Sequence, residues 1–349
     1  MNSIDVLQFV RKLKMEIDNG SDCRFVFFLG AGCSVSSGIP DAATLVIYWL
    51  KLLKHLQTGN VNDFDSWVKS RFPDFNEEKA ASFYGRIIEE LYPSSKARQE
   101  EVERIVEKSL PSFGYAILAQ LITHPIYGKY FNTIITTNFD DLAADAIYLF
   151  TNKKPLVIYH ESLINFVRIS SFQPVIIKLH GDVRFAPKNI ESETKSLDKN
   201  VEKTLNNLFS ERGIIFVGYG GNDKSIGNLL SSLSKNSLPC GIYWVGNRLP
   251  KSVIGEWLQS RNATWVKHQD FDELMLITWY YFNLKHPDLN KFSRILEVYI
   301  KTFNLIKSQV ENNIDHTQKI SIKNIWEEAL NKFENDWHYE VERRGDKSE

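Results

Sequence analysis

The chain has 349 residues, of which 43% are hydrophobic, and its formal net charge at pH 7 is −1. This length and composition suffice for one large globular domain with an extension, or for two modest domains. The balanced charge excludes a protein that binds nucleic acid through an overall basic field, and the Lys and Arg residues form no basic stripe.

The three cysteines, Cys23, Cys33 and Cys240, are widely spaced and form no Cys-x-x-Cys pair. We therefore expect no zinc module, no other metal site and no disulfide scaffold. The N-terminus lacks a signal-peptide core, and no run approaches the ~18 apolar residues of a membrane span. A cytoplasmic protein without membrane contact is the expectation.

The first elements are a helix over residues 3–18 and a buried strand over residues 25–29, which are all apolar. The strand runs into Gly-Ala-Gly at 30–32, and such turns bring backbone N–H groups up to a phosphate. Val35 stands where the dehydrogenase fingerprint requires glycine, and no Gly-Lys-Ser/Thr follows. Taken alone, the turn indicates only a phosphate or nucleotide loop, and a turn without a ligand is the alternative.

A helix over residues 42–55 is apolar on nearly all sides, which predicts burial or an interface. Residues 56–123 then show no strand pattern and contain helical segments separated by Pro73, Pro93 and Pro111. We interpret this region as a helical insertion that forms a cap over the loop at 30–40.

Further strands are predicted at residues 131–135, 155–159, 174–179, 214–217, 241–245 and 263–267. Several of them end in polar or glycine-rich segments and alternate with helical patterns. This alternation predicts an α/β fold with a doubly wound, mostly parallel sheet, and ligands bind at the carboxyl edge of such sheets. Residues 274–284, 288–308 and 320–337 show only helical patterns, residues 188–197 a loop, and the charged tail from 340 onward is expected to be disordered.

Four of these segments, GAGCSVSSGIP, TTNFDD, KLHGD and FVGYGGND, occur in an order that resembles the sirtuin superfamily over roughly residues 22–275. In particular, the series resembles the sirtuin-like domains of bacterial antiphage-defence proteins, which hydrolyse NAD+. The resemblance implies a Rossmann-like domain of sirtuin type over residues 1–275. Residues 276–349 would form a helical region for oligomerisation or partner docking.

The resemblance also implies three catalytic residues. Asn138 would hold ribose hydroxyls and the attacking water, Asp140 the nicotinamide amide, and His180 matches the family's catalytic histidine. Independently of the family, His180 follows a strand at its carboxyl end, and an imidazole suits proton removal near neutral pH. The implied NAD+-binding residues are Gly30, Ala31, Gly32, Ser34, Ser37, Gly38, Pro40, Asp41, Thr137, Gly218, Gly220, Gly221, Asn222, Asp223 and Asn247.

Two departures from the family separate this chain from the lysine deacylases. Ala42 and Ala43 replace the Phe and Arg that usually follow the Ile-Pro-Asp segment, and the small domain with paired cysteines is absent from the sequence. That domain helps to build the groove for the acyl-lysine peptide, whereas cleavage of NAD+ does not require it. Cys33 lies inside the loop without a base nearby in sequence and is interpreted as a small filler residue.

The sequence therefore predicts an NAD+ hydrolase that releases nicotinamide and ADP-ribose and acts as the toxic effector of an antiphage, abortive-infection system. Such an enzyme has to be held inactive, so we expect a homo-oligomer and a regulatory partner, such as an ATPase of a defence operon or a phage-derived trigger. Two alternatives stay open: a protein deacylase or ADP-ribosyltransferase, and a binding module that senses NAD+ or ADP-ribose without turnover.

Overall fold

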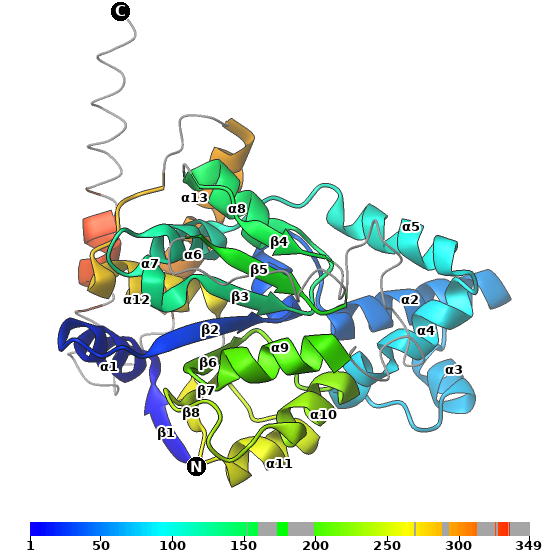
Figure 1. The fold of residues 1–349 in the computed structure, drawn as a ribbon. Helices are drawn as coiled ribbons and strands as arrows, with labels where there is room; N and C mark the ends of the chain where they lie inside the picture. The colour runs from blue at the N-terminus through cyan, green and yellow to red at the C-terminus, as the bar shows by residue number, and fades with distance from the viewer. Residues whose placement is uncertain are drawn as a thin grey trace, which may run out of the picture.

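The computed structural model describes residues 1–151, 153–159, 173–180, 199–268, 270–287, 293–312, 325, 327–333 and 335 (Figure 1). Within them, eight strands form one sheet in the order β1-β8-β7-β6-β2-β3-β5-β4, and every neighbouring pair runs parallel. The predicted doubly wound parallel α/β fold is thus confirmed. The strands are β1 (Asn2–Asp5), β2 (Arg24–Leu29), β3 (Thr133–Thr136), β4 (Leu156–Ile158), β5 (Val175–Lys178), β6 (Arg212–Val217), β7 (Ile242–Gly246) and β8 (Thr264–Lys267).

Strand β2 lies inside the sheet, between β3 and β6, and both of its faces are buried. Phe25, Phe27 and Leu29 belong to the core on one side of the sheet, whereas Val26 and Phe28 belong to the core on the other side. A strand covered on both faces needs apolar residues at every position, which explains the continuous run in the sequence.

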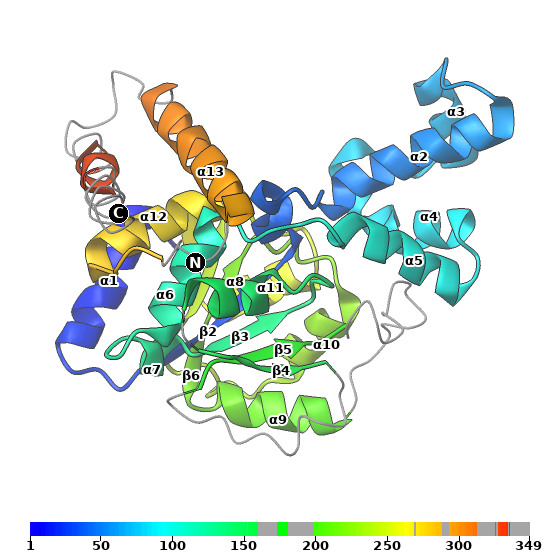
Figure 2. The same ribbon diagram turned by 90° about the horizontal axis from the view of Figure 1, so that it is seen from above.

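Helices cover both faces of the sheet (Figure 2). One layer consists of α1 (Val6–Asp18), α6 (Phe113–Thr123), the short α7 (Gly128–Phe131), α8 (Leu142–Phe150), α12 (Phe271–Phe282) and α13 (Ser293–Asn312). The other layer consists of α9 (Lys199–Phe209), α10 (Lys224–Ser232) and α11 (Val253–Ser260). Phe303 of α13 is buried in the same core as the strands, so this C-terminal helix is part of the sheet's own packing.

The helical insertion forms a separate hydrophobic cluster and projects to one side of the sheet (Figures 1 and 2). Its bounds differ from the expected residues 56–123: the cluster, called the insertion from here on, contains α2 (Ala42–Thr58), α3 (Phe64–Arg71), the 3₁₀ helix η2 (Glu77–Phe83), α4 (Tyr84–Leu91) and α5 (Ser95–Val106). Trp49 of α2 is fully buried at the centre of this cluster. Helix α6, by contrast, packs in the layer on the sheet.

The order in which strands are added to the sheet reverses at β2. Strand β3 is added on one side of β2, and the later strand β6 is added on its other side. In open α/β sheets a crevice forms at such a reversal, outside the carboxyl ends of the strands. The topology therefore brings the segments that follow β2, β3, β5 and β6 to one edge.

Two sequence-based expectations are wrong. Residues 3–5 are not helical, because they form the edge strand β1, which pairs with β8. Helix α1 begins at Val6, where the side chain of Asp5 accepts a hydrogen bond of 2.8 Å from the backbone N–H of Gln8.

The second wrong expectation is that the cysteines stay unpaired. Cys23 and Cys240 form a disulfide, although 217 residues separate them in the sequence. The parallel order β7-β6-β2 brings the segments before β2 and β7 together.

The predicted loop at 188–197 and the tail from 340 onward lie outside the described residues, as do Gly181, Asp182 and parts of the pattern at 320–337. Of the helices that the structure describes, none combines the length and the apolar character that crossing a membrane requires.

Candidate active site

The glycine-rich segment after β2 packs directly against the end of β6. Gly30 donates its N–H to the carbonyl of Val217 at 3.0 Å, and Gly32 donates to the carbonyl of Gly218 at 2.8 Å. A Cβ atom on Gly30 would lie 2.5 Å from the Cα of Tyr219, and one on Gly32 would lie 2.9 Å from the Cα of Gly218. The glycines therefore allow two backbones to approach closely, and the 3₁₀ helix η1 (Ala31–Ser37) starts from this contact.

Ser34 of η1 is fully buried and joins three side chains in one hydrogen-bond network. Its hydroxyl donates to Oδ2 of Asp140 at 2.8 Å and accepts from Nδ2 of Asn138 at 3.1 Å. The hydroxyl of Tyr115 lies 3.1 Å from the same Oγ. Since Ser34 gives its one proton to Asp140, Tyr115 is the donor in that contact, and the Ser34 hydroxyl is saturated.

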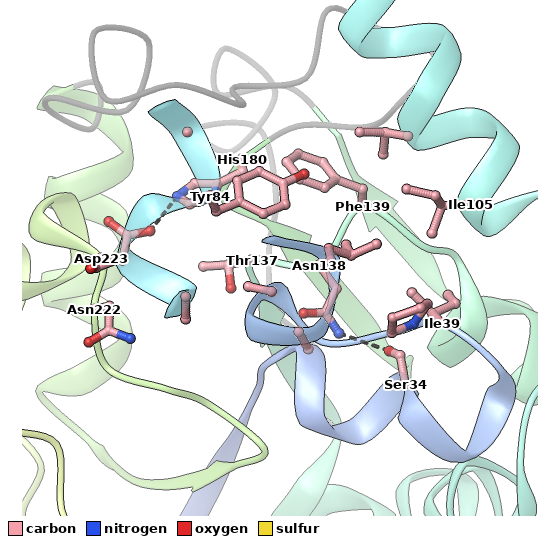
Figure 3. Close-up of a pocket in the computed structure, with 18 of the residues that line it drawn as sticks. Ser34, Ile39, Tyr84, Ile105, Thr137, Asn138, Phe139, His180, Asn222 and Asp223 are labelled. Atoms are coloured by element: carbon pink, nitrogen blue, oxygen red, sulfur yellow. Dashed lines mark hydrogen bonds and ion pairs between the residues drawn. The ribbon is translucent and has the colours of Figure 1, made fainter. Parts of the chain in front are cut away.

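The network sets the orientation of the Asn138 amide. Its Nδ2 donates to the backbone carbonyl of Gly30 at 3.1 Å as well as to Ser34, so both amide hydrogens are used. The backbone N–H of Asn138 is bound by the hydroxyl of Thr136. In Figure 3 the amide nitrogen is turned toward Ser34 and the oxygen Oδ1 away from it, which leaves Oδ1 as the group able to receive a ligand's hydrogen bond.

Asp140 lies beside this network at the start of α8. Burial raises the pKa of Asp140, while the hydrogen bond from Ser34 and the charge of Lys178 oppose the rise. Lys178, in turn, donates from Nζ to the carbonyl of Phe139 at 2.8 Å and to Oδ1 of Asp141 at 3.0 Å. These bonds tie the end of β5 to the segment that follows β3.

His180 follows β5 and pairs with Asp223, which follows β6. Nε2 of His180 lies 2.7 Å from Oδ2 of Asp223, although the ring is not aligned for a linear hydrogen bond (Figure 3). The other oxygen of Asp223, Oδ1, caps α10: it accepts from the N–H and the hydroxyl of Ser225 and from the N–H of Ile226. Burial raises the pKa of Asp223, but the close contact with His180 and the hydrogen bonds from Ser225 and Ile226 outweigh burial and lower the pKa overall.

These groups face a cavity of about 710 Å³ at the carboxyl edge of the sheet (Figure 3). Its volume falls within the range of ligand pockets, roughly 300–1,000 Å³. The sheet contributes the polar wall, which includes Asn138, Asp140, His180 and Asp223. The insertion contributes most of the apolar wall, which includes Leu45, Phe83, Tyr84, Val102, Ile105 and Val106.

The residues predicted to form the site divide into two groups. The following line the cavity: Ala31, Ser34, Pro40, Thr137, Asn138, Asp140, His180, Asn222 and Asp223. The others, Gly30, Gly32, Ser37, Gly38, Asp41, Gly218, Gly220, Gly221 and Asn247, do not line it. Several of these have local structural contacts instead: Gly38 ends η1 with φ of 89°, Asp41 caps α2, and the Ser37 hydroxyl accepts a hydrogen bond from the N–H of Ser112.

The sequence did not identify Tyr115 or the cavity residues of the insertion, such as Tyr84, Arg86 and Ile105. Tyr115 sits within an apolar helix, where its spacing is that of a core residue. No motif marks the insertion residues either, because they reach the cavity only through the packing of α2 to α5. Among the described residues, no group of three or more His, Cys, Asp or Glu side chains is arranged to hold a metal ion.

Burial of Cys33 gives no support to a role as a nucleophile. The side chain is 1% exposed, and its Sγ lies 3.3 Å from the carbonyl of Val217. Burial raises the pKa of the Cys33 thiol well above its ordinary value, so the reactive thiolate is disfavoured.

Residues 132–266 match the family model of the SIR2-like domain. The match covers β3 to β8 and with them Asn138, His180 and Asp223, whereas the glycine-rich segment after β2 precedes it. Among curated proteins, none matches the chain.

Solved structures with a similar fold include three Sir2 proteins. One is a Sir2 variant with a deacetylated p53 peptide and 3′-O-acetyl ADP-ribose (14% identity, 81% of this chain and 100% of that chain covered, TM-score 0.42). Another is Sir2Tm bound to a propionylated peptide (14% identity, 78% and 99% covered, TM-score 0.39). A third is a variant of a Sir2 homologue in complex with ADP-ribose (16% identity, 78% and 98% covered, TM-score 0.39). At these identities and TM-scores, no residue role is transferred from them to this chain.

Proposed function

We propose that this chain hydrolyses NAD+ to nicotinamide and ADP-ribose. The observation that carries the proposal is the convergence of Asn138, Asp140 and His180 on one cavity at the carboxyl edge of the sheet. The match of residues 132–266 to the SIR2-like domain also favours a site for NAD+. The expected substrate is NAD+ itself, and the reaction needs no metal.

The chemistry requires little from the protein beyond positioning. The nicotinamide of NAD+ is already cationic and departs as a neutral molecule, so no general acid is required. Oδ1 of Asn138 is placed to hold the attacking water or a ribose hydroxyl, because both hydrogens on Nδ2 are used by Gly30 and Ser34. His180 is the base in this scheme, and Asp140 would bind the nicotinamide amide.

The insertion supports hydrolysis by shielding the reacting atoms. Its side chains, among them Phe83, Tyr84 and Ile105, line the cavity opposite the polar wall. Exclusion of bulk water strengthens each polar contact in the site and leaves the attack to one positioned water. We assign the chemistry to residues 1–275, with the insertion as the cap.

The same proposal extends to the cellular role, on the resemblance alone. Uncontrolled hydrolysis of NAD+ kills a cell, so the enzyme would serve as the effector of an antiphage, abortive-infection system in the cytoplasm. It would be restrained by homo-oligomerisation or by a regulatory partner. Residues 276–349 are the candidate docking region, and Leu305 on α13 is 50% exposed there.

The test is to incubate the purified chain with NAD+ and to measure free nicotinamide and ADP-ribose, with and without candidate activators. Asn138→Ala and His180→Ala should abolish release. Asn236→Ala and His55→Ala are matched controls at exposed positions outside the cavity and should retain it. Release that occurs only with an acylated peptide would identify a deacylase, and tight binding of NAD+ without turnover would identify a sensor.

A further inference from the structure

The contact between Asp223 and His180 is not needed for the local structure of helix α10, which Asp223 caps. Asp223 caps α10 entirely through Oδ1, which takes the three hydrogen bonds from Ser225 and Ile226. Asn or Ser would cap the helix about as well. The cap leaves Oδ2 unused by the helix, and this oxygen lies 2.7 Å from Nε2 of His180.

We propose that Asp223 is the positioning residue of His180: its carboxylate holds the ring so that Nε2 carries the proton and Nδ1 is the basic nitrogen. In a neutral imidazole one nitrogen is a donor and the other an acceptor, and the partner of the first decides which is which. A carboxylate only accepts, so it selects the Nε2–H tautomer. Helix α10 anchors this carboxylate, because the cap prevents Asp223 from turning away from the ring.

The consequence for the reaction rests on the proposed function. The bond between C1′ of the ribose and the nicotinamide nitrogen breaks, and its electron pair leaves with nicotinamide. The water oxygen bonds to C1′, and the proton released from the water passes to Nδ1 of His180 and then to solvent. While His180 holds this proton, the negative charge of Asp223 at 2.7 Å stabilises the imidazolium. Poor alignment of the pair without substrate is common for catalytic contacts, which tighten when substrate binds.

Other charged groups share the surroundings of His180. Among the described residues, the cavity is also lined by Asp140, Arg86 and Lys224. Lys178 precedes His180 on β5, but its Nζ is directed to Phe139 and Asp141. The carboxylate of Asp223 is in direct contact with Nε2 of His180, so its removal should dominate any change in the tautomer of the ring.

Asp223→Asn separates the two roles of the residue, because Asn retains the cap and loses the charge. We would read the tautomer of the His180 ring by ¹⁵N NMR of the full chain, assign its signal with His180→Gln, and record nicotinamide release. The wild type should show the Nε2–H tautomer. In Asp223→Asn no carboxylate selects this tautomer, so the share of Nδ1–H should rise, and turnover should fall by about 10²-fold.

Asp5→Asn makes the same change at the N-cap of α1 and is the matched control. It should leave the tautomer of His180 and the turnover unchanged. If Asp223→Asn does not fold, Asp223→Ser retains a capping oxygen and removes the carboxylate. An unchanged tautomer in the folded variant would overturn the pairing. Absence of nicotinamide release from the wild type would instead refute the proposed function, while the tautomer measurement still decides the pairing.

Discussion

Ser34→Ala is the most informative single change, because the Ser34 hydroxyl connects the loop after β2 to the catalytic candidates. The substitution removes the donor to Oδ2 of Asp140, the acceptor for Nδ2 of Asn138 and the partner of the Tyr115 hydroxyl. Asn138 keeps its bond to Gly30. Two buried groups, the Tyr115 hydroxyl and Oδ2 of Asp140, therefore lose a partner.

Each buried group left unsatisfied lowers stability by about 1–3 kcal/mol. We therefore expect Ser34→Ala to lower the free energy of unfolding by roughly 2–5 kcal/mol, measured by urea unfolding with linear extrapolation. The loss of the Ser34 bond should also raise the pKa of Asp140 further. A carboxyl with a raised folded-state pKa destabilises the protein as pH rises from its ordinary pKa of 3.8 toward the raised value. The difference in the free energy of unfolding between wild type and Ser34→Ala should therefore become smaller as pH falls from the raised pKa of Asp140 toward 3.8.

A double-mutant cycle with Tyr115→Phe isolates the contribution of the network. Tyr115→Phe alone leaves the Ser34 hydroxyl bound to Asp140 and Asn138, so it should be milder. In the combined variant no tyrosine hydroxyl is left unsatisfied, and the two changes together should destabilise less than their sum, by about 1 kcal/mol. If the two effects add within about 0.5 kcal/mol, the hydrogen bond between the two hydroxyls has no energetic role and the reasoning fails.

Three further changes test other parts of the structure. Gly32→Ala places a Cβ 2.9 Å from the Cα of Gly218, and this overlap can be relieved only by moving the backbone. The substitution should therefore lower the free energy of unfolding by about 1–3 kcal/mol in the same urea assay. Burial raises the pKa of Asp272 to about 6, so its ionisation destabilises the fold as pH rises from 3.8 through 6. Asp272→Asn should remove that slope and raise stability at pH 7 by at most about 3 kcal/mol, and a variant with an unchanged pH profile of stability would contradict the assignment. The Cys23–Cys240 disulfide closes a loop over 217 residues of sequence separation, and its reduction should lower stability by about 5 kcal/mol on chain entropy alone. Unfolding midpoints that are equal with and without reductant would exclude this contribution.

The sequence alone determined the class of fold and the edge of the sheet on which the candidate site lies. Buried parallel strands are continuous apolar runs, so β2, β3, β5 and β6 were recognisable one at a time from local composition. Ligand sites at the carboxyl edge follow from the topology of such sheets, and the segments around Asn138, His180 and Asp223 stood at predicted strand ends. The motif order resembled the sirtuins for the same reason, since each motif is a short local segment.

Only the tertiary structure decided which atoms meet. The sequence of β1 has little strand character of its own, and the strand forms because its backbone pairs with the edge strand β8. Tyr115 contacts Ser34 only because η1 packs against α6. Asp223, which the resemblance gave as an NAD+-binding residue, lies 2.7 Å from His180 only because β5 and β6 end at the same edge of the sheet. Gly30 and Gly32, read from the sequence as phosphate ligands, donate their N–H groups to β6 and to the residue after it. Partners that lie tens to hundreds of residues apart leave no local pattern, because their geometry exists only after the sheet has assembled.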